Sequence, residues 1–181
     1  MKNSAFWSGI LGGLVLAALI GFLILPLLGI FDTTATGKRN ILDWWGEMNL
    51  ENSLRWRAAD GAIPAGADLE EGFEHYRAMC LHCHGGPDAQ RQEWAHNMLP
   101  VPPKLWDEEV QHMTDAQLFS IVKDGIRMTG MPAFGPTHSN KDIWRIVAFV
   151  RRLDHLTPEQ KHELQKASMS FGHHEEDEHD H

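Results

Sequence analysis

The sequence contains no cluster of basic side chains. Its 16 Lys and Arg residues are outnumbered by 25 Asp and Glu residues, which gives a formal net charge of −9. Residues 61–172 alone carry eleven basic and fifteen acidic side chains. Binding to DNA or RNA depends on basic groups that neutralise phosphates, so this composition argues against a nucleic-acid partner.

Charge is also missing from Ala5 to Ile30. A helix of this length measures roughly 39 Å at about 1.5 Å per residue, which spans a bilayer core of about 30 Å with some tilt. A cleaved secretory signal is the alternative, but its apolar core usually runs only about 7–15 residues, and no A-x-A cleavage pattern follows here. We therefore expect residues 1–30 to be a retained transmembrane anchor in contact with lipid. Either alternative sends the remainder of the chain across the membrane.

Cysteine is scarce, and both cysteines fall in Cys80-Leu81-His82-Cys83-His84. This is the C-x-x-C-H arrangement for covalent haem attachment. Two thiols on one helical turn can add to the two vinyl groups of haem, and the imidazole of His84 then reaches the iron. The absence of a second Cys pair argues against zinc, and the absence of a β pattern argues against a thioredoxin-like redox pair. A disulfide would leave His84 without a role, so we predict one covalent haem c.

An electron carrier needs a second axial ligand that keeps the iron six-coordinate, and a thioether sulfur favours ferrous iron. The candidate is Met131, in the segment Gly130-Met131-Pro132-Ala133-Phe134-Gly135, where glycine and proline supply an irregular backbone. Met128 is the rival, and the remaining methionines are expected to pack in the interior.

Periodicity and capping signals predict helices and no strands. Asp68 is a plausible N-cap for a helix that leads into Cys80, and further helices are expected over about 114–124, 139–153 and 158–167. A long irregular stretch with four prolines should separate the cysteines from the helix expected over about 114–124. Before them, residues 41–59 mix Trp44, Trp45 and Trp56 with charged side chains. This segment suits the headgroup layer of a membrane, or a helix that packs on its own domain or on a partner subunit.

Three pieces of the chain resemble the class I cytochrome c family, in particular its small membrane-tethered, single-haem members. They are Gly72-x-x-x-Tyr76-x-x-x-Cys80, Gly130-Met131-Pro132-Ala133-Phe134, and Asp142-Ile143-Trp144-Arg145-Ile146-Val147-Ala148-Phe149. The resemblance implies an all-α fold in which the first and third pieces cross, with Gly72 and Tyr76 near Phe149. It gives a cytochrome c domain over 67–156, behind the anchor (1–30) and a linker with the Trp-rich segment (31–66), and followed by a C-terminal extension (157–181).

The same resemblance implies roles for individual residues. His84 would be the proximal haem ligand and Met131 the distal one, and a proline carbonyl would accept a hydrogen bond from the second nitrogen of His84. The segment 100–105 offers several prolines, of which Pro103, followed by Leu105, is preferred. Arg127 would pair with a haem propionate or would be a solvated arginine.

For function, the resemblance implies a non-enzymatic, membrane-tethered, single-haem cytochrome that carries single electrons. Because haem is attached outside the cytoplasmic membrane in this family, the domain would lie on the periplasmic, outer face of a bacterial inner membrane behind a single span. The donor would be a quinol-oxidising complex or a dehydrogenase, and the acceptor a terminal oxidase or reductase. The alternative is a fixed haem-relay subunit of a larger respiratory or dehydrogenase complex. A haem sensor or enzyme needs an open iron site, which Met131 argues against.

The chain ends in a run of histidines and acids. Imidazole and carboxylate together suit zinc, copper or nickel, so the tail is a candidate metal site. The alternative is a solvated, disordered acidic end. The four histidines concerned are His173, His174, His179 and His181.

Overall fold

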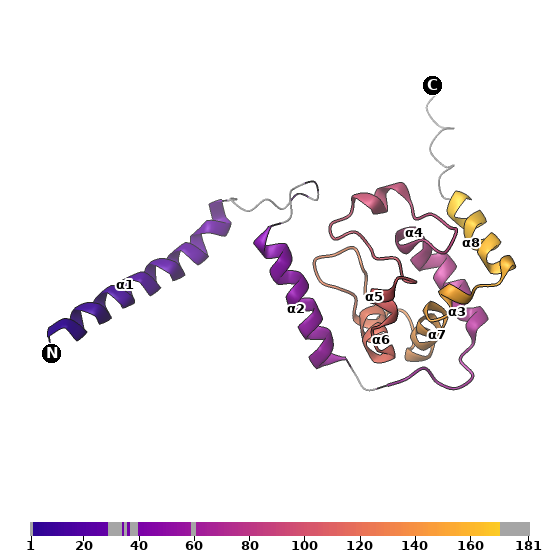
Figure 1. The fold of residues 1–181 in the computed structure, drawn as a ribbon, viewed down its shortest axis with the longest axis horizontal. Coiled ribbons are helices and arrows are strands. Elements are labelled where there is room, and N and C mark those ends of the chain that lie inside the picture. Colours follow the sequence, from indigo (N-terminus) through magenta and orange to yellow (C-terminus); the bar gives the residue numbers. More distant parts are fainter. Residues whose placement is uncertain (1, 29–33, 35, 37–39, 59–60, 171–181) are drawn as a thin grey trace, which may run out of the picture. The chain divides into compact units, whose positions relative to one another are not determined.

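The computed structural model of the chain describes residues 2–28, 34, 36, 40–58 and 61–170, with the backbone alone described at 2–5, 26 and 57. The chain divides into two compact units, Met1–Lys38 and Arg39–His181. Within the described ranges all regular structure is helical (Figure 1), and Gly86 and Ala89 form an isolated bridge. The predicted all-α fold is therefore confirmed.

The first unit is a single apolar helix, α1 (Lys2–Ile24), which continues as a 3₁₀ turn, η1 (Leu25–Leu28). The α-helical hydrogen bonding ends beside Pro26, which has no backbone N–H to donate. Residues Phe6–Ile24 have a mean hydropathy of 2.2, and their side chains are not buried against the protein. Length and composition thus allow this helix to cross a membrane, and a retained anchor and a signal sequence meet that criterion equally.

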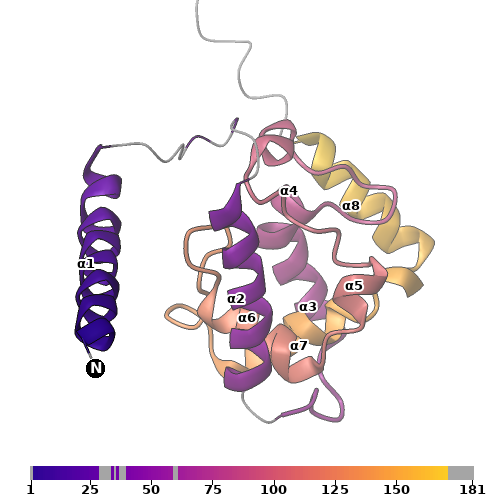
Figure 2. The ribbon, with the colours of Figure 1, turned by 60° about the vertical axis from the view of Figure 1, so that its left-hand side comes forward.

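The second unit contains all the remaining described helices, which Figures 1 and 2 show from two directions. In chain order they are α2 (Ile41–Arg57), α3 (Leu69–His75), the π-helical turn η2 (Tyr76–Cys80), α4 (Leu81–His84), the 3₁₀ turn η3 (Glu93–Asn97), α5 (Glu108–Gln111), α6 (Asp115–Asp124), α7 (Asn140–Val150), the 3₁₀ turn η4 (Leu153–His155) and α8 (Pro158–Ser170).

Side-chain caps mark the starts of several of these helices, α3, α6 and α7 among them. Asp68 Oδ1 accepts a hydrogen bond from the Glu71 backbone N–H at 3.1 Å, so α3 begins as the sequence predicts. Helices α6 and α7 each begin with a capping box, formed by Thr114 with Gln117 and by Ser139 with Asp142.

Helices α3 and α7 cross at Gly72. A Cβ atom on Gly72 would lie 2.3 Å from the backbone oxygen of Arg145, so only glycine allows this close approach. Beside the crossing, the Phe149 ring lies 5.4 Å from that of Phe73 and 5.3 Å from that of Tyr76, measured between centroids. The predicted crossing of the two helices is confirmed. The three rings are almost fully buried, and they form the centre of the core.

Helix α8 packs on the rest of the second unit and contacts α4 (Figure 2). Leu164 is fully buried, and its Cδ1 lies 3.0 Å from the position that a Cβ on Gly86 would take. Gln92 Nε2 donates to the Ser168 carbonyl at 3.2 Å, which adds a polar contact to the same interface. Helix α8 therefore covers the residues that directly follow the haem-attachment motif in the chain. The division of the chain at residues 30, 66 and 156 stays a prediction.

Candidate haem site

The two cysteines lie on consecutive helical turns that end in His84. Cys80 is the last residue of η2, and His84 is the last residue of α4. Cys80 and His84 are buried, Cys83 is half-buried, and the thiols are free rather than joined in a disulfide. Burial, and to a lesser extent the neighbouring Cys83, raise the pKa of the Cys80 thiol to about 12. The S–H form, which adds across a vinyl group, is therefore favoured.

The imidazole of His84 is oriented by a backbone carbonyl. Its Nδ1 lies 2.8 Å from the Pro103 oxygen, and since a carbonyl can only accept, Nδ1 carries the proton. Burial lowers the pKa of His84, the bond to Pro103 opposes this, and Arg91 lowers it further. The ring is thus held neutral with a lone pair on Nε2, the form in which histidine coordinates a metal. Among the prolines of the segment, Pro103 is the one that makes this contact.

Two side chains that the sequence did not single out hold the proline segment in place. Arg91 Nη1 donates to the carbonyl of Pro102, and Gln111 Nε2 donates to the carbonyl of Leu105 at 2.6 Å. Gln111 also bonds the Val150 carbonyl at 3.1 Å, which joins the segment to the end of α7. The carbonyl that contacts His84 is therefore flanked on both sides by anchored backbone. Neither residue has a local sequence signal, because each contact depends on the path of the loop.

Tyr76 fixes the backbone that follows His84. Its hydroxyl donates to the Gly85 carbonyl at 2.6 Å in a fully buried position, and burial raises its pKa well above the usual value. Gly85 has a φ of 71°, and a Cβ there would lie 2.9 Å from the Ala89 oxygen. A glycine is thus required where the chain turns away from the haem-attachment helix.

Met131 lies in a loop that is closed by hydrogen bonds between the loop's own residues. Ile126 N donates to the Met131 carbonyl at 3.2 Å, and Met131 N donates to Thr129 Oγ1 at 3.1 Å. Gly125 has a φ of 64°, and a Cβ there would lie 2.8 Å from the Met131 oxygen, so this turn also needs glycine. The Met131 side chain is half-buried.

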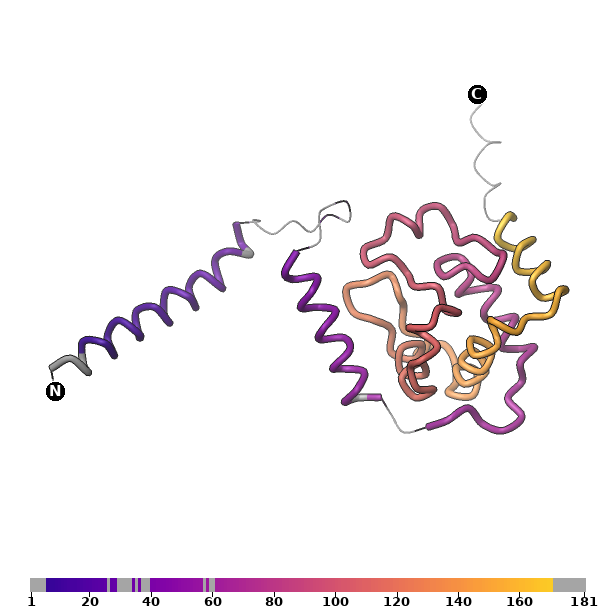
Figure 3. Tube along the Cα trace, in the orientation of Figure 1, coloured from indigo at the N-terminus to yellow at the C-terminus, as the bar shows by residue number. Residues whose placement is uncertain are grey.

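The other methionines near this loop differ in exposure. Met128, the rival ligand, is 93% exposed and has a φ of 61°. Met98 reaches the loop from the proline-rich segment, and its Cε lies only 1.8 Å from where a Cβ on Gly130 would stand. Figure 3 follows both long loops, residues 85–107 and 125–138, through the domain. Met131 therefore remains the better distal candidate than Met128, with Met98 as a neighbour that the sequence did not indicate.

The remaining predicted site residues are less constrained. Leu105 is half-buried and packs against the core, whereas Arg127 is exposed. The tail histidines His173, His174, His179 and His181 lie outside the described residues.

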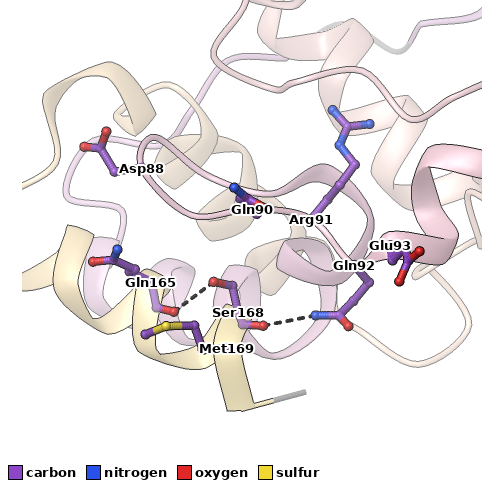
Figure 4. A pocket seen from close by; sticks show the side chains of 8 residues that line it. All are labelled: Asp88, Gln90, Arg91, Gln92, Glu93, Gln165, Ser168 and Met169. Atoms are coloured by element: carbon purple, nitrogen blue, oxygen red, sulfur yellow. Dashed lines mark hydrogen bonds between the residues drawn. The ribbon is translucent and has the colours of Figure 1, made fainter. Parts of the chain in front are cut away.

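A polar cavity of about 450 Å³ lies between residues 88–93 and α8 (Figure 4). In the close-up, Gln92 points toward Ser168 of α8, whereas Arg91 points away from that helix. The lining of the cavity includes neither cysteine and not His84. The cavity is therefore adjacent to the haem-attachment turn without being part of it.

The helical fold, the crossing of α3 with α7 and the C-x-x-C-H turn together define a class of protein: residues 67–150 form a class I c-type cytochrome domain, which carries electrons and implies haem c. The same residues, 67–150, match the family model described as cytochrome C oxidase, cbb3-type, subunit III. No curated protein matches the chain.

Proposed function

We propose that the chain is a membrane-tethered cytochrome with one covalent haem, which passes single electrons between a donor and an acceptor complex. The observation that carries this proposal is the His84 imidazole, whose Nδ1 lies 2.8 Å from the Pro103 carbonyl oxygen and which is preceded by two free thiols. Haem c, when bound, supplies an iron that alternates between the ferric and ferrous states.

Each residue of the site has a definite task in this proposal. Cys80 and Cys83 would hold the haem through two thioethers, each of which would form when a thiol S–H adds across one vinyl double bond, a reaction that needs no oxidant. His84 would hold the iron through Nε2, and Pro103 keeps the ring in the orientation and tautomer that such a bond needs. Met131 would be the second residue to hold the iron, from the loop that Gly125 and Thr129 shape. Arg127 is exposed and remains a candidate partner for a propionate.

The proposed location is the outer face of a bacterial inner membrane, with α1 as the tether. A tether keeps the haem near membrane complexes and replaces a search in three dimensions by a local one. A quinol-oxidising complex or dehydrogenase as donor, and a terminal oxidase or reductase as acceptor, fit this position.

A second candidate function is a fixed relay within a larger respiratory complex. It is favoured by the match of residues 67–150 to a family described as an oxidase subunit. Purification in a mild detergent separates the two candidates. A mobile carrier would elute alone, whereas a relay would elute with other haem-containing or metal-containing subunits.

The ligand assignment is tested by visible spectra of the detergent-purified protein with and without carbon monoxide. We expect low-spin bands that carbon monoxide does not change, because both axial positions of the iron are filled. Met131→Ala should open one position, so that the ferrous form binds carbon monoxide and the reduction potential falls. Met98→Leu is the matched control and should leave both properties unchanged. Rapid carbon monoxide binding by the unmodified protein would instead indicate a sensor or an enzyme.

A further inference from the structure

Helix α2 carries its tryptophans, its largest apolar side chains, on the face that the domain does not cover. Ile41, Trp44, Trp45 and Met48 follow the i, i+3, i+4, i+7 spacing of one helical face, and Trp56 extends the same face by two turns. The exposed fractions of the three tryptophans are 56%, 57% and 83%. These five residues are called the tryptophan face below.

The opposite face of α2 is the one that packs. Leu50, Ser53 and Leu54 lie there and are half-buried, and α2 contacts α6. A helix that only covered its own domain would turn its largest apolar side chains inward. The tryptophans of α2 point the other way, so packing within the domain does not account for them.

The chain places this face close to any membrane that α1 enters. Only twelve residues separate Leu28 from Ile41, and their fully extended length is at most about 40 Å. Two of them, Lys38 and Arg39, are basic and precede Asn40, the N-cap of the helix. Tryptophan rings favour the headgroup layer, and basic side chains favour the phosphates of that layer.

We propose that α2 is an interfacial helix whose tryptophan face lies in the headgroup layer of the bilayer, an inference that rests on the membrane tether proposed above. Because α2 also contacts α6, and the end of α6 leads into the Met131 loop, the helix holds one side of the haem domain at the membrane surface. The domain is then restricted to a few orientations, in contrast to a domain on a free linker. The occupant of the tryptophan face is thus lipid, as opposed to a protein partner.

The test uses the full-length holoprotein in nanodiscs of phosphatidylcholine and phosphatidylglycerol. Asn52 is exposed and lies on the tryptophan face, so Asn52→Cys places a nitroxide label there, while the native cysteines are blocked as thioethers. Glu159, which is exposed at the start of α8, is the matched control position and is labelled in the same way through Glu159→Cys. The measurement, made on the nanodisc fraction, is how often each label collides with two reagents. One is oxygen, which enters lipid, and the other is a water-soluble nickel complex.

We expect the oxygen-to-nickel collision ratio to be several-fold higher at position 52 than at position 159. The double substitution Trp44→Ser, Trp45→Ser should lower the ratio at position 52 to that of the control, without altering the haem spectrum or the retention in nanodiscs. Equal ratios at the two positions in the unsubstituted protein would overturn the inference. So would a label at position 52 that is immobilised and shielded from both reagents, since that result indicates contact with a second copy of the chain.

Loss of the protein from the nanodiscs would refute the tether itself. Flotation of the nanodiscs measures this property separately, so failure of the tether is distinguished from failure of the interfacial helix.

Discussion

The hydrogen bond from Tyr76 to Gly85 joins the helix that enters the haem-attachment turn to the backbone that leaves it. Its two partners are nine residues apart and fully buried, so water cannot replace either of them. A buried acceptor that loses its donor retains the whole cost of its desolvation. The buried Tyr76–Gly85 hydrogen bond therefore stabilises the turn more than a hydrogen bond from a surface hydroxyl would.

Tyr76→Phe removes this donor and leaves the Gly85 carbonyl buried without its partner. We expect the free energy of unfolding of the holoprotein to fall by about 1–3 kcal/mol, as measured by denaturant titration. Thr137→Val is the matched control, because Thr137 Oγ1 donates to the Phe134 carbonyl in an exposed position where water can replace it. A Tyr76→Phe variant as stable as the control would show that the bond contributes nothing.

At this scale the sequence predicts the haem attachment more completely than the surroundings of the haem. Cys80, Cys83 and His84 lie within five consecutive residues, so their proximity follows from the helix alone. The choice of Pro103 among neighbouring prolines depends on the fold, and the sequence supplied only a preference. Arg91 and Gln111 act on carbonyls eleven and six residues away. No local pattern indicates such contacts.

At the scale of secondary-structure elements, the crossing of α3 and α7 depends on a missing side chain. Gly72→Ala would place a Cβ 2.3 Å from the Arg145 oxygen, which is backbone and cannot rotate aside. We expect the holoprotein to lose about 1–3 kcal/mol of stability through overpacking. Gly46→Ala in α2 is the control, because a Cβ there meets nothing within 4 Å and improves the helix by up to about 1 kcal/mol. Equal or greater stability of Gly72→Ala would show that the two helices can separate without cost.

The capping box of α7 should make stability depend on pH. The pKa of Asp142 is lowered chiefly by the hydrogen bonds it accepts from Ser139, and further by Arg145. Because the pKa of Asp142 is lowered in the folded state, ionised Asp142 stabilises the fold at every pH above its usual pKa, which is near 3.8. This stabilisation is lost as the pH falls through the lowered pKa.

We therefore expect Asp142→Asn to lower the Tm at neutral pH and to differ less and less from the parent protein as the pH falls well below 4. The Asp142 side chain is still 25% exposed, so water screens its charge and the effect at neutral pH should be a few degrees at most. Thermal unfolding followed by circular dichroism measures both curves. Asp107→Asn is the control, because Asp107 precedes α5 without a side-chain cap bond. A constant Tm difference across the pH range would contradict the assignment.

The longer elements were predictable because their signals are local. Asp68, Thr114 and Ser139 cap helices whose apolar periodicity runs for several turns, so their starts could be read from the sequence. Helix α5 and the turn η3 contain only four and five residues, too few for a periodic pattern. They form where Val110 and Ala95 are buried, so their existence depends on the tertiary structure. The π-helical turn that ends at Cys80 also leaves no signal in the helical periodicity of the sequence.

At the scale of the whole molecule, segments outside the family match contribute to the folded unit. Helix α8 buries Leu164 and Ala167, and α2 contacts α6, although residues 67–150 alone match the family. The sequence predicts a C-terminal extension at α8 and leaves packing of α2 on its own domain as one of several alternatives, because the packing partners of both segments are distant in the chain. The domain between them is mildly acidic and carries the haem-attachment turn, as composition and motif predicted.

The central claim is that the chain carries one haem c, attached through Cys80 and Cys83. Intact-protein mass spectrometry of the detergent-purified protein after acid denaturation tests it most directly, because thioethers survive denaturation whereas iron coordination does not. The account predicts a single species with the mass of the polypeptide plus one haem, and no covalent haem after Cys80→Ala, Cys83→Ala double substitution. A polypeptide without haem, with its two thiols free, oxidised to a disulfide or bound to zinc, would contradict it.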